Sequence, residues 1–367
     1  MCKAMFASYV GIDLHKTTLT IGCLDPEKRI RRVVKIDTKC VDKIVEAIIS
    51  LPRPIACAIE SVGMYEWLWD LLEDKVDALV LADAAEVSRK RKRGKAKTDK
   101  NDALLLARLL LIDEVPTAYV PEKDFRTLRK LGRHYHRTSK MLAEIKIQMR
   151  WCLNQNNARG PKSISPASAQ RWILAHGHRL DNCSLFAFKQ HLGMMERLET
   201  DKACIVREMK LIGKDEQFKR ELDLIQSVTG IGPVIGFIIH AEIADFSRFP
   251  NGDTIACYTG LTTRTNESAG KVRQGHISKC GNSTLRWALV EAATTLIQHD
   301  QKYQRMHQRI TMNKGADTSI NRHIAKIAIA QKIIRYLRKM MITGEVFRKG
   351  EPTNRQAMLN QIRLAKN

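Results

Sequence analysis

The sequence lacks the features that would place the protein in a membrane or in an oxidising compartment. No window reaches the roughly eighteen consecutive apolar residues of a membrane-spanning helix. The opening residues, MCKAMFASYVGIDLHK, alternate in polarity and run into Asp13, which is not the layout of a signal peptide. The nine cysteines are odd in number and include no C-x-x-C pair, so neither a disulfide framework nor a zinc site is indicated. We therefore expect a reduced, cytosolic protein.

Acidic residues are also scarce, with 39 Asp and Glu against 62 Lys and Arg and a formal net charge of +23. The imbalance begins abruptly along the chain. Residues 1–85 hold 11 Lys and Arg against 13 Asp and Glu, a net charge of −2, whereas residues 86–160 hold 19 against 8, a net charge of +11. Such a field attracts phosphate backbones without implying sequence specificity. Nucleic acid is the expected partner, although a solvated basic protein would have the same composition.

Residues 1–117 predict a mixed α/β domain. Three strand patterns, FASYVGIDL, TTLTIGCLD and RIRRVVKID, precede a helix pattern, CVDKIVEAIIS. The strand RPIACAIES, the helix MYEWLWDLLED and the strand VDALVLAD follow. A basic loop then leads into the helix DKNDALLLARLLLID, for which Thr98 is the expected N-cap. An order of hairpin strands followed by crossovers suits a mixed sheet.

The rest of the chain predicts mainly helices. Residues 118–220 contain two long helical patterns with basic polar faces, which indicate either a coiled-coil arm or a plain helical hairpin. Residues 221–345 begin with a G-I-G-P turn between helices. That turn is helix-hairpin-helix-like and could offer N–H groups to phosphate, or it could be an ordinary glycine turn. Residues 346–367 form a polar tail that we expect to be loosely ordered.

Four acidic residues of the first domain stand at the ends of predicted elements. Asp13 and Glu60 each close a strand, and acids that end neighbouring strands can converge. Asp99 and Asp102 open a helix and, being three positions apart, share a helix face. Hard oxygen ligands of this kind suit one or two Mg²⁺ ions, and two such ions can clamp a phosphodiester. Taken singly, each acid could instead be a turn residue or complement a helix dipole.

The stretches YVGIDLHK, AIES and KTDKNDA resemble the D-E-D-D transposases of the insertion-sequence one-ten family and the related Piv DNA invertases. The resemblance implies a RuvC-like N-terminal domain with an RNase H fold, a helical arm and a mainly α C-terminal transposase domain. It places Asp13, Glu60, Asp99 and Asp102 at the positions of the acidic tetrad, which would bind Mg²⁺.

A second resemblance concerns the C-terminal block YTGLTTRTNESAGKVRQGHISKCGNSTLRWALVEAA. Members of the family carry a nucleophilic serine there, and Ser268 takes its position in a glycine-flanked loop. Ala269 replaces a family glycine, and Thr263 or no residue corresponds to the family's proline. Ser278 is the rival nucleophile, but its position in the family tolerates threonine.

Basic residues near both motifs are expected to hold nucleic-acid phosphates. Near the acids they are Arg89, Lys90, Arg91, Lys92, Arg93, Lys95 and Lys97, and near the serine they are Arg264, Lys271, Arg273, Lys279 and Arg286. A structural salt bridge would explain Arg286 equally well. His15, His134 and His136 have no metal-ligand spacing with a cysteine, so we interpret them as solvent-facing or phosphate-contacting.

As a whole, the resemblance implies a site-specific DNA recombinase or transposase of an insertion sequence in the bacterial cytosol. It further implies a serine–phosphate intermediate, guidance by a noncoding bridge RNA, and a dimer that forms a tetramer on donor and target DNA. No membrane partner is expected. Two other classes stay open, namely a RuvC-like metal-dependent nuclease and a non-catalytic nucleic-acid binder derived from a transposase.

Overall fold

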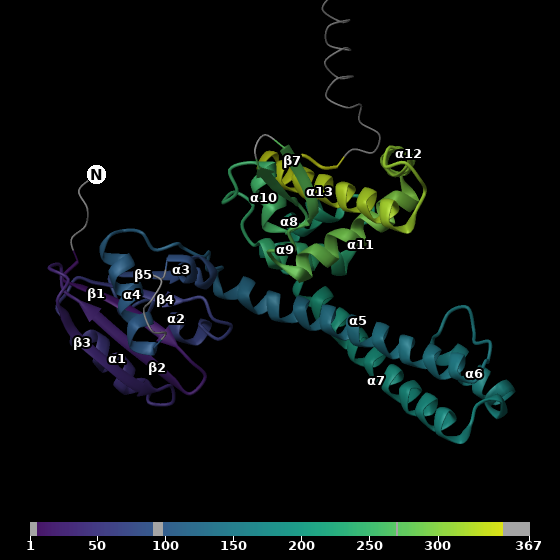
Figure 1. The fold of residues 1–367 in the computed structure, drawn as a ribbon, viewed down its shortest axis with the longest axis horizontal. Coiled ribbons are helices and arrows are strands. Elements are labelled where there is room, and N and C mark those ends of the chain that lie inside the picture. Colours follow the sequence, from purple (N-terminus) through teal and green to yellow (C-terminus); the bar gives the residue numbers. More distant parts are fainter. Residues whose placement is uncertain (1–5, 91–97, 269–270, 348–367) are drawn as a thin grey trace, which may run out of the picture. The chain divides into compact units, whose positions relative to one another are not determined.

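The computed structural model describes residues 6–90, 98–268 and 271–347, and between residues 264 and 276 it describes only the course of the backbone. The chain falls into two compact units, Met1–Val120 and Pro121–Asn367 (Figure 1). Within the described residues, every helix is too short or too polar to cross a membrane.

The first unit contains a mixed five-stranded sheet with the strand order β3-β2-β1-β4-β5. Strands β1, β2 and β3 are antiparallel neighbours, whereas β4 pairs parallel to β1 and β5 parallel to β4. The strands span Ser8–Leu14, Thr18–Leu24, Ile30–Asp37, Ile55–Glu60 and Ala78–Ala82, in chain order. The prediction of an RNase H-like mixed sheet is confirmed.

Four helices accompany this sheet: α1 (Val41–Ile49), α2 (Glu66–Leu72), α3 (Ala84–Lys90) and α4 (Asp99–Leu111). Helices α1 and α2 contribute buried side chains such as Ile48 and Leu68 to a core with β1, β2 and β4. Helix α3 is a correction, because the sequence predicted a loop directly after β5. It has seven residues and a single buried side chain, Val87, so its apolar pattern is too weak to predict a helix.

Two paired glycines allow α4 to lie directly on the sheet. Gly11 of β1 and Gly22 of β2 are partners across the strand pair. A Cβ atom on Gly11 would stand 2.1 Å from the carbonyl oxygen of Ala103, and one on Gly22 would stand 3.1 Å from the backbone nitrogen of Leu104. Any side chain at Gly11 would therefore push the helix away. The close approach brings the first turn of α4 to the carboxyl end of β1.

The second unit begins with two long helices, as the sequence predicted. Helix α5 (Lys123–Gln155) and helix α7 (Asn182–Ile212) lie side by side as an arm (Figure 1). The short helices α6 (Pro166–His176) and η1 (Gly177–Arg179) connect them. The arm has its own buried cluster, which includes Met149, Trp172 and Phe188.

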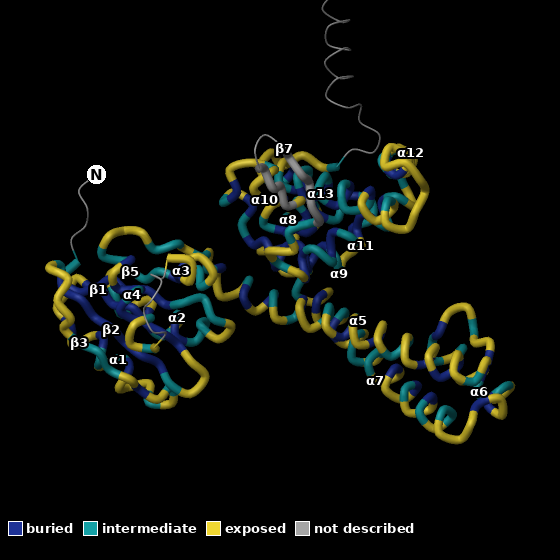
Figure 2. The backbone as a smooth tube through the Cα atoms, in the orientation of Figure 1, coloured by how far each residue is buried: buried dark blue, intermediate teal, exposed yellow. Residues whose placement is uncertain are grey.

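The remainder of the second unit is mainly helical and carries one β-hairpin. Its elements are α8 (Glu216–Gln226), α9 (Pro233–Ile243), α10 (Gly252–Tyr258), β6 (Thr263–Ser268), β7 (Lys271–Ile277), α11 (Ser283–His299), α12 (Gln301–Met312) and α13 (Ser319–Thr343). The buried core gathers around α9, α11 and α13 (Figure 2). In the G-I-G-P turn, Gly230 has a φ of 95°, and a Cβ there would stand 2.8 Å from the carbonyl oxygen of Ala292. This glycine therefore lets the turn pack closely against α11.

Candidate active site

Two acidic side chains end neighbouring parallel strands of the first unit. The register pairs Ile12 of β1 with Ile59 of β4, so the next residues, Asp13 and Glu60, lie side by side at the carboxyl edge. Asp13 is buried, and Glu60 is partly buried. The structure thus brings together the two strand-end acids that the sequence singles out.

The first turn of α4 brings a third carboxylate to the same place. Thr98 caps the helix, its side-chain oxygen accepting a hydrogen bond from the backbone N–H of Asn101 at 3.2 Å. The N-cap prediction is confirmed. Asp99 Oδ1 and Asp13 Oδ2 each lie 3.3 Å from the same atom, His15 Nε2. Asp102 follows one turn along α4 and is close enough to raise the pKa of Asp13.

Two basic residues complete the cluster, and the sequence did not reveal either role. His15 is half-exposed, which fits a solvent-facing residue, but it also bridges Asp13 and Asp99. Lys35 donates to Asp99 Oδ2 at 2.8 Å. The strand register explains Lys35, because Asp13 pairs with Thr20 and Thr20 pairs with Lys35 in one row across three strands. Side chains in one row share a face of the sheet, and that row becomes visible only once the register is known.

The electrostatics of the cluster favour an added cation. Burial raises the pKa of Asp13; the charge of His15 opposes this, and the nearby Asp102 and Asp99 add to the rise. The hydrogen bond from Lys35 is the main cause that lowers the pKa of Asp99. A buried carboxylate among other acids is stabilised in its charged form by positive charge, which Lys35 supplies here and His15 supplies when it is protonated.

The residues present fit a divalent metal ion. Asp13, His15 and Asp99 can each offer one ligand atom, and these atoms lie within 4.8 Å of one another. Mg²⁺ prefers carboxylate oxygens, so the two aspartates would be its ligands and His15 the replaceable partner. The cluster therefore suits metal-assisted chemistry on a phosphate ester.

The predicted phosphate-binding residues before α4 are only partly described. Arg89 and Lys90 lie on α3 and not in a loop, and each already pairs with an acid. Arg89 contacts Glu86, and Lys90 Nζ donates to Glu114 Oε2 at 2.9 Å. The other predicted contacts, Arg91, Lys92, Arg93, Lys95 and Lys97, lie outside the described residues.

The serine motif falls on the β6–β7 hairpin, where the sequence predicted a loop. Ser268 ends β6 and is paired with Lys271 of β7. The turn residues 269–270 lie outside the described residues, as do the side chains of Arg264, Ser268, Lys271 and Arg273. The role of Ser268 therefore stays a prediction.

The rival serine and its neighbours lie just after the hairpin. The backbone N–H of Ser278 donates to the carbonyl oxygen of Thr262 at 2.8 Å. Lys279 is exposed and has a positive φ of 52°. Arg286 Nη1 donates to the carbonyl oxygen of Thr259 at 3.2 Å, so this arginine supports the backbone near its own helix.

Comparison with known proteins covers both units. A family model of DEDD transposases matches residues 10–157, and the model described as Transposase IS116/IS110/IS902 family matches residues 222–308. A putative transposase of Sinorhizobium fredii, y4pF/y4sB, is 32% identical over 39% of this chain and 36% of its own length. Another from the same organism, y4qE, is 26% identical over 56% of this chain and 50% of its own length.

A third relative aligns over a longer stretch. The transposase for insertion sequence element IS1533 of Leptospira borgpetersenii is 22% identical over 66% of this chain and 72% of its own length. The chain spans about a third to a half of the length of the two Sinorhizobium relatives. The similarities therefore concern both units of the chain but only parts of those two proteins.

Proposed function

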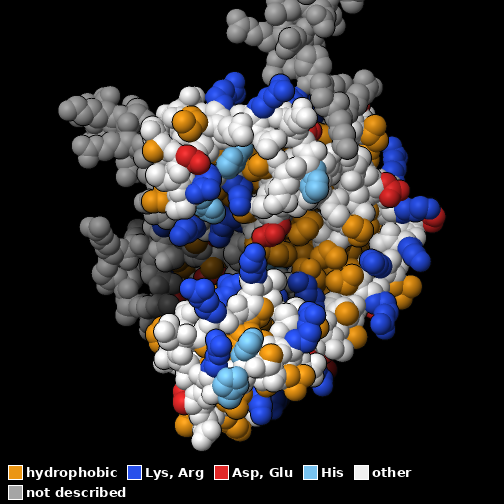
Figure 3. All heavy atoms as spheres, turned by 90° about the vertical axis from the view of Figure 1, so that its right-hand side faces the viewer, with side chains coloured by type: hydrophobic (Ala, Val, Ile, Leu, Met, Phe, Trp, Pro, Cys, Tyr) orange, Lys and Arg blue, Asp and Glu red, His pale blue; other side chains and the backbone are white. Residues whose placement is uncertain are grey.

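Since this chain belongs to the IS116/IS110/IS902 family of transposases, with a DEDD N-terminal domain and the family's C-terminal domain, we propose that it cleaves and joins DNA strands for an insertion sequence. The observation that carries the proposal is the meeting of Asp13 and Asp99 at the carboxyl edge of an RNase H-like sheet, with Glu60 beside them. Donor and target DNA would be its substrates. The face of the molecule in Figure 3 carries many more Lys and Arg than Asp and Glu side chains, which suits a polyanionic substrate.

In this proposal the four acids Asp13, Glu60, Asp99 and Asp102 hold one or two Mg²⁺ ions. When bound, the metal offsets negative charge that develops on the phosphodiester oxygens. The protein's own part is to hold the carboxylates in position before the metal binds. Burial holds Asp13 in place, while Lys35 and His15 reduce the repulsion between the acids.

Ser268 would supply the nucleophile. Its hydroxyl oxygen forms a bond to phosphorus, the bond from phosphorus to the departing deoxyribose oxygen breaks, and the serine proton ends on that oxygen. A hydroxyl of the new strand then attacks the same phosphorus, the bond from phosphorus to the serine oxygen breaks, and the serine regains its proton. Storing the phosphodiester on the protein keeps its bond energy available for joining.

Replacing the serine tests this chemistry. Ser268→Ala should abolish both strand exchange and the covalent protein–DNA adduct, because alanine has no oxygen to attack with. The adduct is measured by denaturing electrophoresis with labelled element-end DNA. Ser278→Ala is the matched control and should keep the adduct.

Other outcomes identify the alternatives. A Ser268→Ala protein that still cuts DNA would contradict the serine intermediate and favour a metal-dependent nuclease. If the wild type does not cleave DNA, and if loss of either Ser268 or Asp13 leaves DNA binding unchanged, the protein is a binder without catalytic activity.

We further propose that a noncoding bridge RNA of the element guides the reaction, a partner that the family resemblance implies and the net charge of +23 accommodates. In the strand-exchange assay above, protein and DNA alone should be inactive. Addition of RNA transcribed from the DNA flanking the gene should restore exchange. Full activity without RNA would contradict this partner.

The arm is the proposed site of self-association. It exposes large apolar side chains, namely Ile147 at 60%, Trp151 at 58% and Phe186 at 66%. Exposed apolar side chains of this size favour burial against a partner, and a second copy of the arm offers the same kind of surface. We propose that arms pair in a dimer and that two dimers meet on DNA.

A double substitution tests the dimer. Trp151→Glu with Phe186→Glu should convert dimers to monomers in light-scattering measurements, because charge would enter an apolar contact. Deleting the arm is a poorer test, since α5 also contributes Leu128 to the main core. Ile320→Glu, at a 70% exposed position on α13, is the control. Dimers that persist in the arm variant would exclude the arm as the contact.

A further inference from the structure

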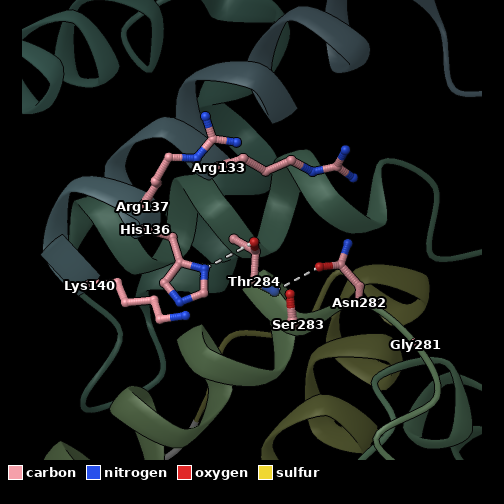
Figure 4. A pocket seen from close by; sticks show the side chains of 8 residues that line it. All are labelled: Arg133, His136, Arg137, Lys140, Gly281, Asn282, Ser283 and Thr284. Carbon is pink, nitrogen blue, oxygen red and sulfur yellow. Dashed lines mark hydrogen bonds between the residues drawn. The ribbon is translucent and has the colours of Figure 1, made fainter. Parts of the chain in front are cut away.

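A basic cavity of about 680 Å³ lies in the second unit, between α5 and the start of α11 (Figure 4). Its α5 wall consists of Arg133, His136, Arg137 and Lys140, and residues 281–284 form the opposite wall. No acidic side chain is among these lining residues. The lining residues include none of the four acids of the first unit. Of the residues predicted to face solvent or contact phosphate, they include His136.

One of the cationic residues already has its counterion. Arg133 makes two hydrogen bonds, of 2.8 and 2.9 Å, to the two carboxylate oxygens of Glu242. Glu242 is fully buried, and its Oε2 also accepts a hydrogen bond from Asn282 Nδ2 at 2.6 Å. This carboxylate therefore orients Arg133 and offsets part of its charge, since it also pairs with Arg129 at 3.7 Å.

The other two cations are uncompensated. Arg137 and Lys140 lie three positions apart on α5, and both are exposed. Within the part of the chain that the structure describes, neither makes a hydrogen bond or an ion pair. Figure 4 shows the Lys140 side chain beside His136, with its ammonium group toward Ser283. Two unpaired positive charges in a concave site leave a potential that an anion would satisfy.

The remaining α5 residue of the wall, His136, packs against α11. The His136 ring stacks on Trp287, with centroids 4.5 Å apart and an interplanar angle of 15°, and His136 Nδ1 lies 3.1 Å from Thr284 Oγ1. Burial lowers the pKa of His136 and the charge of Lys140 lowers it further, against a smaller opposite effect of Glu242, so the neutral ring is favoured. The ring thus fixes the cavity floor without adding a charge.

The N-terminus of α11 contributes little to anion binding by itself. Asn282 Oδ1 already accepts hydrogen bonds from the N–H groups of Thr284 and Leu285, both at 3.0 Å. Binding must therefore come from the side chains of Arg137 and Lys140. The volume lies within the range of roughly 300–1,000 Å³ that is typical of small-ligand pockets, so a phosphate with its attached sugar has room.

We propose that this cavity binds a backbone phosphate of a nucleic-acid strand through Arg137 and Lys140. A guanidinium group can hold two phosphate oxygens at once, while an ammonium group acts as a point charge. The assignment rests on the proposed function, since it presumes a protein that works on nucleic acid. It adds an anchoring contact on α5 of the second unit.

Binding measurements test the cavity. The variant Arg137→Gln with Lys140→Gln is titrated by fluorescence anisotropy against labelled duplex DNA and, separately, single-stranded RNA of equal length, over a range of salt concentrations. At low salt its affinity should fall roughly ten- to hundredfold, because two phosphate contacts and their counterion release are lost. For duplex DNA the slope of log K against log salt should shrink by about 2.

A charge-matched control separates the cavity from general attraction. Arg150→Gln with Lys189→Gln removes two exposed charges from α5 and α7 outside the cavity and should have a smaller effect. An affinity loss that is larger in the cavity variant than in the control supports the proposal. If this larger loss occurs with DNA alone or with RNA alone, it also identifies the strand that the cavity binds. Equal losses in the two double variants, or none, would overturn it. Failure of the wild type to bind either nucleic acid would instead contradict the proposed function.

Discussion

Asp13→Asn should abolish DNA strand cleavage, lowering the rate by at least about a thousandfold, which corresponds to about 4 kcal/mol of lost transition-state stabilisation. Asparagine keeps the size and shape of the side chain but removes the negative charge that would hold Mg²⁺ between β1 and α4. Binding of DNA should remain, because the basic surface is unchanged. Cleavage of labelled DNA and its equilibrium binding, measured in parallel, check both halves of the expectation.

The same substitution should not destabilise the fold. Burial is the main reason that the pKa of Asp13 is raised, so its ionised form is less favourable in the folded chain than in the unfolded one. At neutral pH the ionised carboxylate therefore costs stability, and asparagine removes that cost. The free energy of unfolding, measured with urea, should stay equal or increase. A gain in stability with a loss of activity would distinguish a functional carboxylate from a structural one.

Asp74→Asn provides the control for this experiment. Asp74 is exposed and, among the described residues, forms an ion pair with its neighbour Lys75 outside the acidic cluster. Its loss should change neither cleavage nor stability by a measurable amount. If Asp13→Asn cleaved DNA as fast as the wild type, the interpretation of the acidic cluster as a metal site would be wrong.

The local features of the first unit could be predicted because they depend on neighbours in the sequence. Alternating apolar residues located β1, a short buried apolar run located β4, and a capping residue located the start of α4 at Thr98. The strand-end positions of Asp13 and Glu60 follow from the same patterns. The order of strands and helices is typical of one mixed sheet, and this order was enough to expect the two acids near each other.

The features that escaped prediction depend on contacts distant in the sequence. Lys35 joins the cluster because three strands align Asp13, Thr20 and Lys35 in one row, and no local pattern fixes that register. The β6–β7 hairpin escaped because TRTNES and KVRQGHI carry few apolar residues, so alternation gives no signal. Polar strands of this kind are determined by their pairing and not by burial.

Glu242 is the clearest case, since it lies within the apolar stretch GFIIHAEI and has no Asp, Lys or Arg neighbour there to draw attention. Its partners are far away in the sequence. Arg133 and Arg129 approach from α5, and Asn282 approaches from the start of α11. A single fully buried carboxylate thus connects three helices of the second unit.

Glu242→Gln should lower the free energy of unfolding of the second unit by about 3 kcal/mol or more. The amide cannot balance the guanidinium charges, and Arg129 is only 12% exposed, so its charge would be left largely buried without a counterion. One carbonyl oxygen also replaces two charged acceptors, so at least one donor among Arg133 and Asn282 loses its bond. Urea unfolding followed by circular dichroism measures the loss, and Glu216→Gln, at a side chain 87% exposed, should cost almost nothing.

Substituting both partners separates the ion pair from the space it fills. Arg133→Met should be costly alone, because it removes the bidentate partner of a fully buried carboxylate. Glu242→Leu should be costly alone for the converse reason. Together they leave no buried charge at this pair and pack apolar groups in its place, so the double variant should lose clearly less than the sum of the single losses. Additive losses would mean that Glu242 acts through Arg129 and Asn282 alone, and that the position of Arg133 at the cavity is not set by this carboxylate.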